Sequence, residues 1–270
     1  MTSGTLRRYI PFATSSLQAS MQYRADLLVS LLTTSVSTAV VVFLWRAVIT
    51  QQPDDALGGF TVAGITTYLL AAQLLTLMHN SKAGEDTSQE IVGGDIAVSL
   101  VRPVSYPVSR VFMALPTALT NLVLVGLPLT AVFALLFPMS APSPLGLALF
   151  VLAAIPSVVI AFSIQLLVGM SALITTNTWG VGMVVNSLIV FLSGALVPLD
   201  LLPRPIEAVA SFLPFQSMVY GPVQLLLERY DGLGEAALIM LRQGVWAVVM
   251  VLVSALVWRT ALRRIEVLGG

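Results

Sequence analysis

The sequence contains no cysteine, one histidine and one lysine, and only 10% of its 270 residues are charged. The absence of cysteine excludes disulfide bonds and thiol chemistry. A single histidine without cysteine argues against a zinc site, so we expect this chain to bind no metal and no cofactor. Basic and acidic residues number 13 each, and the net charge of zero gives no electrostatic support for a nucleic-acid partner.

Catalytic motifs are also missing. The sequence has no Gly-x-Ser-x-Gly or His-Glu-x-x-His motif, and no pair of carboxylates falls within its apolar runs. The only lysine, Lys82, follows Asn80 and Ser81, so there is no phosphate-binding Walker A loop. We therefore expect a chain that is not an enzyme and cannot hydrolyse ATP by that route.

Hydrophobic residues, by contrast, make up 57% of the chain, and the mean hydropathy is +0.94. Soluble domains carry about 25% charged residues, whereas lipid solvates apolar side chains. Long apolar runs favour helices over the alternating strands of an outer-membrane barrel. We expect one all-α integral membrane domain, residues 1–270, with six transmembrane helices. The six runs are Leu27–Ile49, Phe60–His79, Val108–Phe137, Leu145–Thr175, Trp179–Pro198 and Ala236–Trp258.

The distribution of basic residues predicts the orientation. About nine arginines and lysines lie in or beside one set of connections, and about four in or beside the other. Cytoplasmic loops carry the excess of positive charge. We therefore expect both termini on the cytoplasmic side of a bacterial inner membrane.

Three segments outside the spans carry information. Residues 1–25 include apolar positions at three- and four-residue spacing, which predicts an amphipathic interfacial helix or, alternatively, a plain flanking arm. Residues 80–107 form the most polar stretch; Thr87 and Glu90 match a capping box, and Gly93-Gly94 is expected to end that short helix. This cytoplasmic loop is either a docking element or a solvated turn.

The third segment, residues 199–235, is too apolar for an ordinary loop and too rich in proline for a span. Its short amphipathic pieces fit a re-entrant outer helical hairpin before the last span, or an interfacial loop.

Polar groups within the spans have two readings. Amide and hydroxyl side chains bridge helices or line a substrate route, and a lone His79 is expected to be a hydrogen-bonded structural group. Two stripes of small or polar residues at helical spacing are candidate helix or subunit interfaces. They comprise Ser30, Thr34 and Thr38 on the first span, and Gly182, Asn186, Val190 and Ser193 on the fifth.

The layout resembles the permease subunits of type-two ABC exporters, in particular the small permeases called viologen-exporter-like, which work in pairs. Two stretches carry the resemblance: EIVGGDIAVSLVRPVSYP at Glu90–Pro107 and SGALVPLDLLPRPIEAVASFLPFQSMVYGPVQLLL at Ser193–Leu227. The resemblance implies a permease that moves a small amphipathic or hydrophobic compound, driven by two separate ABC ATPase subunits that bind the ATP and Mg²⁺. A second permease chain, identical or paralogous, would complete the path within the lipids.

The resemblance also assigns roles to residues. The first cytoplasmic loop would couple to the ATPase, the first and fifth spans with the two stripes above would form the dimer interface, and the outer hairpin would close the path. The expected coupling residues are Glu85, Asp86, Glu90, Ile91, Gly93, Gly94, Asp95, Leu100, Arg102 and Pro103. The expected residues of the path or outer gate are Asn121, Gln165, Pro203, Pro214, Tyr220 and Arg242.

Three other functions compete with this interpretation. A lipid-modifying membrane enzyme needs a nucleophile–base pair or a metal cluster, neither of which is visible. An ion-coupled carrier needs carboxylates within the membrane or inverted repeats. A non-transporting membrane anchor for an ATPase would have a similar sequence, and an export assay would separate it from a permease.

Overall fold

The computed structural model describes residues 8–22, 24–52, 56–101, 104–175 and 177–268, and within them the chain is almost entirely helical. In chain order the first elements are α2 (Ile10–Gln22), α3 (Arg24–Ile49), β1 (Ala56–Leu57), β2 (Phe60–Thr61), α4 (Val62–His79), α5 (Ala83–Gly93) and α6 (Ile96–Val101). Then follow α7 (Tyr106–Asn121), the π-helical turn η1 (Leu122–Gly126), α8 (Leu127–Leu136), α9 (Pro144–Met170), the 3₁₀ turn η2 (Ser171–Leu173) and α10 (Thr178–Leu192). The last elements are η3 (Leu199–Leu201), α11 (Arg204–Phe212), η4 (Pro214–Ser217), α12 (Tyr220–Leu226) and α13 (Gly232–Leu268).

Five helical stretches within the described residues are long and apolar enough to cross a membrane. They are Leu27–Ile49, Val62–Gly93, Tyr106–Leu136, Pro144–Leu173 and Gly232–Thr260. A chain in lipid must satisfy its backbone polar groups internally, which is why such apolar runs become helices. The expectation of an all-α membrane protein is thus confirmed. The expected fifth span contains α10, which has 15 residues and is shorter than the roughly 20 that a straight crossing needs.

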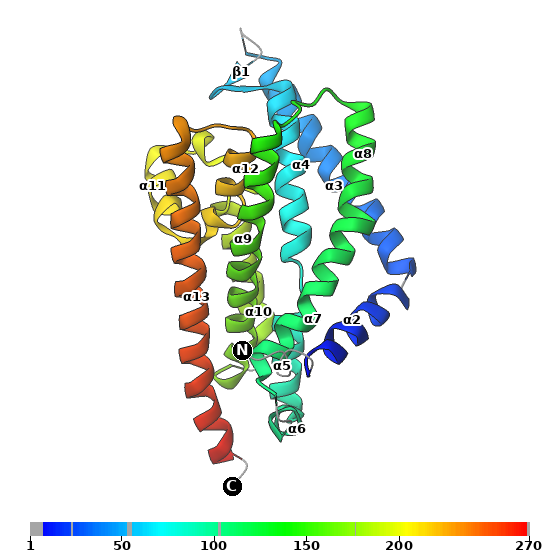
Figure 1. Cartoon of the computed structure of the whole chain (residues 1–270), viewed down its shortest axis with the longest axis vertical. Coiled ribbons are helices and arrows are strands. Elements are labelled where there is room, and N and C mark those ends of the chain that lie inside the picture. The colour runs from blue at the N-terminus through cyan, green and yellow to red at the C-terminus, as the bar shows by residue number, and fades with distance from the viewer. Residues whose placement is uncertain (1–7, 23, 53–55, 102–103, 176, 269–270) are drawn as a thin grey trace.

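The third apolar run bends at a π-helical turn. Proline lacks an N–H and its ring clashes with the carbonyl four residues earlier, so Pro128 cannot continue a regular α-helix from α7. The chain widens instead, and the N–H of Leu127 bonds the carbonyl of Leu122, five residues back. The result is one continuous bent helix from α7 into α8 (Figure 1).

The two ends of the molecule differ in what they carry. The β1–β2 hairpin, α11 and the start of α13 lie at one end, and α5, α6 and the end of α13 lie at the other (Figure 1). We call these the α11 end and the α5 end. The helix α2 crosses α7 obliquely near the α5 end, where the Tyr9 ring stacks on Phe112 with centroids 5.3 Å apart.

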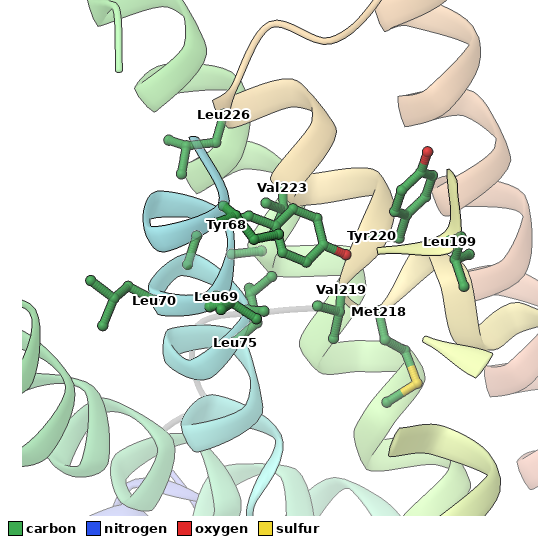
Figure 2. Packing of buried hydrophobic residues seen from close by; sticks show 14 of the residues in the cluster. Tyr68, Leu69, Leu70, Leu75, Leu199, Met218, Val219, Tyr220, Val223 and Leu226 are labelled. Carbon is green, nitrogen blue, oxygen red and sulfur yellow. The ribbon is translucent and has the colours of Figure 1, made fainter. Parts of the chain in front are cut away.

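The main hydrophobic core surrounds α4. Its buried side chains, among them Tyr68, Leu69 and Leu75, face residues of the segment that contains η4 and α12, such as Met218 and Val223 (Figure 2). Because α4 is buried all round over residues 65–72, it is the central helix of the fold. The segment 199–226 is therefore part of the packed structure.

Candidate functional site

Two glycines allow α5 to pack closely against α9. A methyl group on Gly84 would lie 2.5 Å from the backbone oxygen of Gln165, and one on Gly169 would lie 2.5 Å from the backbone oxygen of Gly84. Small residues allow helix backbones to approach this closely. This contact also explains a wrong expectation: α5 begins at Ala83 with Lys82 at its N-cap, so Thr87 lies inside the helix and forms no capping box.

An arginine from α7 holds the acidic face of α5. Arg110 has a side chain only 5% exposed, and it pairs with Asp86 at 3.3 Å and with Glu90. The two carboxylates lie one helical turn apart, so both face the same guanidinium. Burial of an unpaired charge is costly, and this double pairing is what permits Arg110 to be inside.

An aromatic stack continues this cluster into α13. The guanidinium of Arg110 lies over the Tyr106 ring at 4.9 Å, and that ring stacks on Trp258 with centroids 4.8 Å apart and planes 9° apart. The Tyr106 hydroxyl donates to Thr87 Oγ1 at 3.2 Å. We call Asp86, Glu90, Tyr106, Arg110 and Trp258 the α5 cluster.

Further hydrogen bonds tie neighbouring helices to the same place. Ser88 donates to Thr178 at the start of α10 at 2.7 Å. The N–H of Ser105, the N-cap of α7, donates to the Tyr9 hydroxyl at 2.9 Å. The described helix α2 is thus attached to α7, and a cavity of about 370 Å³ lies between them beside Arg110.

The opposite face of the α5–α6 segment is exposed. Its exposed side chains include Glu85 and Gln89 on α5, and Asp95 follows at the turn where Gly94 adopts a positive φ of 80° and ends the helix, as expected. Large apolar side chains are exposed as well: Val92, Val98 and, at 86%, Val101. The segment therefore has an acidic inner face that is already paired and a mixed outer face.

A second arginine cluster lies at the α11 end. Gly58 and Gly59, both with positive φ, form the two-residue turn of the β1–β2 hairpin. The guanidinium of Arg229 donates to both of their carbonyls at 2.9 Å and to Asp200 at 3.2 Å. The same guanidinium lies 3.9 Å from the centre of the Phe60 ring.

Tyr220 completes this cluster. Its hydroxyl donates to Asp200 and accepts a hydrogen bond from Gln224 at 2.7 Å. We call Gly58, Gly59, Asp200, Tyr220 and Arg229 the α12 cluster, since α12 carries Tyr220 and leads into Arg229.

Between the two clusters, buried polar side chains form hydrogen bonds to the turn between η4 and α12. The Gln243 amide on α13 donates to the carbonyls of Ser217 at 2.7 Å and Ala153 at 3.0 Å. Ser157 on α9 donates to the Met218 carbonyl, so its hydroxyl accepts from His79 Nε2 at 2.7 Å. His79 is thus hydrogen bonded within the helix bundle.

A model of the family described as ABC-2 family transporter protein matches residues 36–269. The chain belongs to this family. It is therefore a membrane permease subunit of an ABC transporter, and the family implies association with ABC ATPase subunits. No curated protein matches the chain at a significant level. Within the described residues, no group of three or more His, Cys, Asp or Glu could hold a metal ion.

The expected coupling residues lie in different surroundings in the structure. Asp86 and Glu90 are paired with Arg110, Ile91 packs against the small core beside Trp258, and Glu85 is exposed. Gly93, Gly94 and Asp95 form the exposed turn, and Leu100 belongs to α6. Arg102 and Pro103 lie outside the described residues.

The expected path residues are spread through the permease. Asn121 donates to the carbonyls of Leu77 at 3.4 Å and Asn80 at 3.5 Å, and Gln165 lies beside Gly84, so both are near the α5 end. Pro203 is exposed before α11, Pro214 is buried in η4, and Tyr220 belongs to the α12 cluster. Arg242 is half-buried on α13.

The expected dimer stripes do not form continuous surfaces. Thr38 and Ser193 are buried within their own chain, where Ser193 accepts from the Tyr220 N–H at 2.9 Å. Asn186 is exposed, whereas Ser30, Thr34, Gly182 and Val190 are half-buried. Only part of each stripe is therefore free to meet a second chain.

Sequence reasoning did not select Arg110, Tyr106, Trp258, Arg229 or Gln243 as functional residues. One signal was present: Asp86 and Glu90 share a helix face, and Tyr106 and Arg110 share another at the same spacing. Complementary faces joined by a short loop could have been paired. We make no prediction for Gly58-Gly59 from the sequence, and although such a pair is typical of a two-residue hairpin turn, it gives no hint that Arg229 binds it.

Proposed function

We propose that this permease is the membrane half of a bacterial exporter in which the outer face of the α5–α6 segment docks onto an ABC ATPase. The observation that carries the proposal is the division of this segment. Its inner face is fixed to the ends of α7, α9 and α10, and its outer face is exposed at the end of the molecule. The exposed valines, with Glu85 and Asp95 beside them, suit an apolar groove edged by basic groups.

The orientation in the membrane follows if the α5 end faces the ATPase. With the α5 end in the cytoplasm of a bacterial cell, both termini are cytoplasmic and α2 lies in the inner interface of the membrane. Two permease chains, identical or paralogous, and two ATPase copies make up the transporter. The chain belongs to the viologen-exporter-like subgroup in this proposal, and its cargo is a small amphipathic or hydrophobic compound, because the described spans carry few charges.

The fifth crossing is made by α10 together with the residues that follow it. At 1.5 Å per residue, 15 helical residues span about 22 Å, and the bent segment 193–197 that follows supplies the remainder of a ~30 Å core. The Trp45 indole N–H donates to the Leu196 carbonyl at 3.0 Å, which places this extension beside the end of α3. Six crossings result.

The segment from η3 to α12 is re-entrant in this arrangement. Its turn at Ser217–Met218 bonds Gln243, eleven residues into α13, and Ser157, thirteen residues into α9. At 1.5 Å per residue these positions lie about 16 and 20 Å from the helix starts, close to mid-membrane. The hairpin would close the path from outside.

The docking face is tested with purified permease in lipid nanodiscs and the ABC ATPase that co-purifies with the unmodified chain. Val101→Asp is expected to reduce co-purification and stimulation of ATP hydrolysis at least tenfold, because it places a carboxylate in an apolar contact. The matched control is Leu233→Asp, an apolar residue at the α11 end that is 71% exposed, which should leave both unchanged. Equal binding by Val101→Asp and the unmodified chain would refute the docking face.

A further inference from the structure

A continuous set of side-chain contacts joins α5 to the turn at Ser217–Met218. Arg110 binds α5, its neighbour Tyr106 stacks on Trp258 of α13, and Gln243, fifteen residues earlier on α13, holds the Ser217 carbonyl. All the intervening residues belong to one uninterrupted helix. The α5 end is therefore linked through α13 to the Ser217–Met218 turn, by the stacking contact of Trp258 and the hydrogen bonds of Gln243.

The contact at Arg110 resists movement in more than one direction. Asp86 and Glu90 lie about 6 Å apart along the α5 axis, slightly more than one helical turn, so a single guanidinium bound to both opposes sliding and rotation of α5. The nearly parallel stack of Tyr106 on Trp258 adds a broad apolar contact next to the same guanidinium. A push on α5 must move α7 and α13 or break these contacts.

The contact at Gln243 is equally specific. The side chain is almost fully buried, and its amide nitrogen bridges carbonyls of two different elements, Ala153 on α9 and Ser217 at the end of η4. Since a buried carbonyl without a donor is costly, displacement of α13 favours displacement of the turn that Gln243 holds.

We propose that Arg110 is a positioning residue that makes α5, the start of α7 and α13 move as one body, and that Gln243 passes this movement to the Ser217–Met218 turn. The inference rests on the proposed function, because the ATPase supplies the push on α5. It goes further by naming α13 as the helix that carries the movement, and by naming the residues that connect α13 to α5 and to the turn. Hydrolysis and hairpin movement should then be separable by substitution.

The test uses the absence of cysteine in the native chain. Val209→Cys on the exposed face of α11 provides a single thiol, which is labelled with an environment-sensitive fluorophore in the nanodisc complex with the ATPase. The fluorescence change on addition of ATP and vanadate reports hairpin movement without a known cargo. Co-purification and the rate of ATP hydrolysis are measured on the same samples.

In this background Arg110→Gln is expected to keep co-purification and hydrolysis within about twofold and to lose at least nine-tenths of the fluorescence change. Arg110→Lys, which keeps the charge but cannot hold two carboxylates in the same fork, should recover part of it. The matched control is Arg259→Gln, an exposed arginine next to Trp258, which should respond as the parent does. A full fluorescence change in Arg110→Gln overturns the inference.

Gln243→Met keeps the test decisive if Arg110→Gln does not fold. It removes the donor that holds the Ser217 carbonyl with little change in volume, and the same loss of response with retained hydrolysis is expected. A full response in Gln243→Met overturns the inference. Failure of the parent chain to bind the ATPase would instead overturn the proposed function.

Discussion

Both ends of the permease are organised around an arginine, yet the two arginines differ in burial and in the groups that they bind. At the α5 end Arg110 is buried and takes two carboxylates from one helix, while at the α11 end the Arg229 side chain is 27% exposed and binds two backbone carbonyls and one carboxylate. Each also lies over an aromatic ring, Tyr106 or Phe60. Because the chemistry is the same, the differences in burial and partners indicate how each end of the permease behaves.

The carboxylates that Arg110 binds are near it in sequence, whereas the hairpin turn that Arg229 binds is distant from it. Arg110 and Asp86 are 24 residues apart, and Arg229 and Gly59 are 170 apart. A buried, doubly paired arginine on adjacent helices makes a rigid unit, and a partly exposed one on a hairpin turn makes a clasp that water can compete for. We therefore expect the α5 end to move as a body and the α11 end to open.

The largest effect is expected for Arg110→Gln. This change leaves two carboxylates without their cation and should lower the free energy of unfolding by about 3 kcal/mol, the lower end for broken buried pairs because Asp86 is 40% exposed. Denaturation of the purified permease in detergent micelles measures it. Arg259→Gln should change stability by less than about 0.5 kcal/mol. Equal losses in the two variants would remove the contrast between buried and exposed arginines.

The next effect concerns the shape of the α5 end. Gly84→Ala places a methyl group 2.5 Å from the Gln165 carbonyl oxygen and should cost about 1 to 3 kcal/mol as α5 moves off α9. Gly244→Ala on α13, where the added methyl has no heavy atom within 4 Å, is the control and should be neutral or slightly stabilising. The same denaturation assay applies. A neutral Gly84→Ala would mean that α5 is not seated on α9 as described.

A smaller effect is expected at the α11 end. Arg229→Gln removes three charge-assisted hydrogen bonds, but water can replace them in part, so the loss should be about 1 to 2 kcal/mol. The β1–β2 hairpin should also become more sensitive to protease. Arg204→Gln, an exposed arginine at the start of α11, is the control. A loss as large as that of Arg110→Gln would contradict the view of this end as a clasp.

The same comparison explains what the sequence could predict. The long apolar runs fixed α3, α4, α9 and α13, because a run of that length has no other stable form in lipid. The presence of a short helix in the loop was also predictable, but its start was wrong: the capping pattern at Thr87 was overridden by the seat of Gly84 on α9.

Pairings across space were not predictable from composition or period. Arg110 contributed to the charge count as one more positive residue, although its true role depends on a loop that folds α5 back onto α7. The seat of Arg229 needs the hairpin turn and the end of α12 to meet, and nothing local in either segment specifies the other. Local sequence patterns predict the helices, whereas tertiary packing determines which residues of different helices form pairs.

Tyr220→Phe is the smallest change and separates the clasp from its surroundings. The phenol donates to Asp200 and accepts from Gln224, so its loss should cost about 1 kcal/mol at neutral pH. Denaturation of the purified permease in detergent micelles measures this loss. Gln224→Met is the matched control, because it breaks the neighbouring bond but keeps the phenol and its bond to Asp200. A Tyr220→Phe variant as stable as the parent would show that water already replaces the phenol in the clasp.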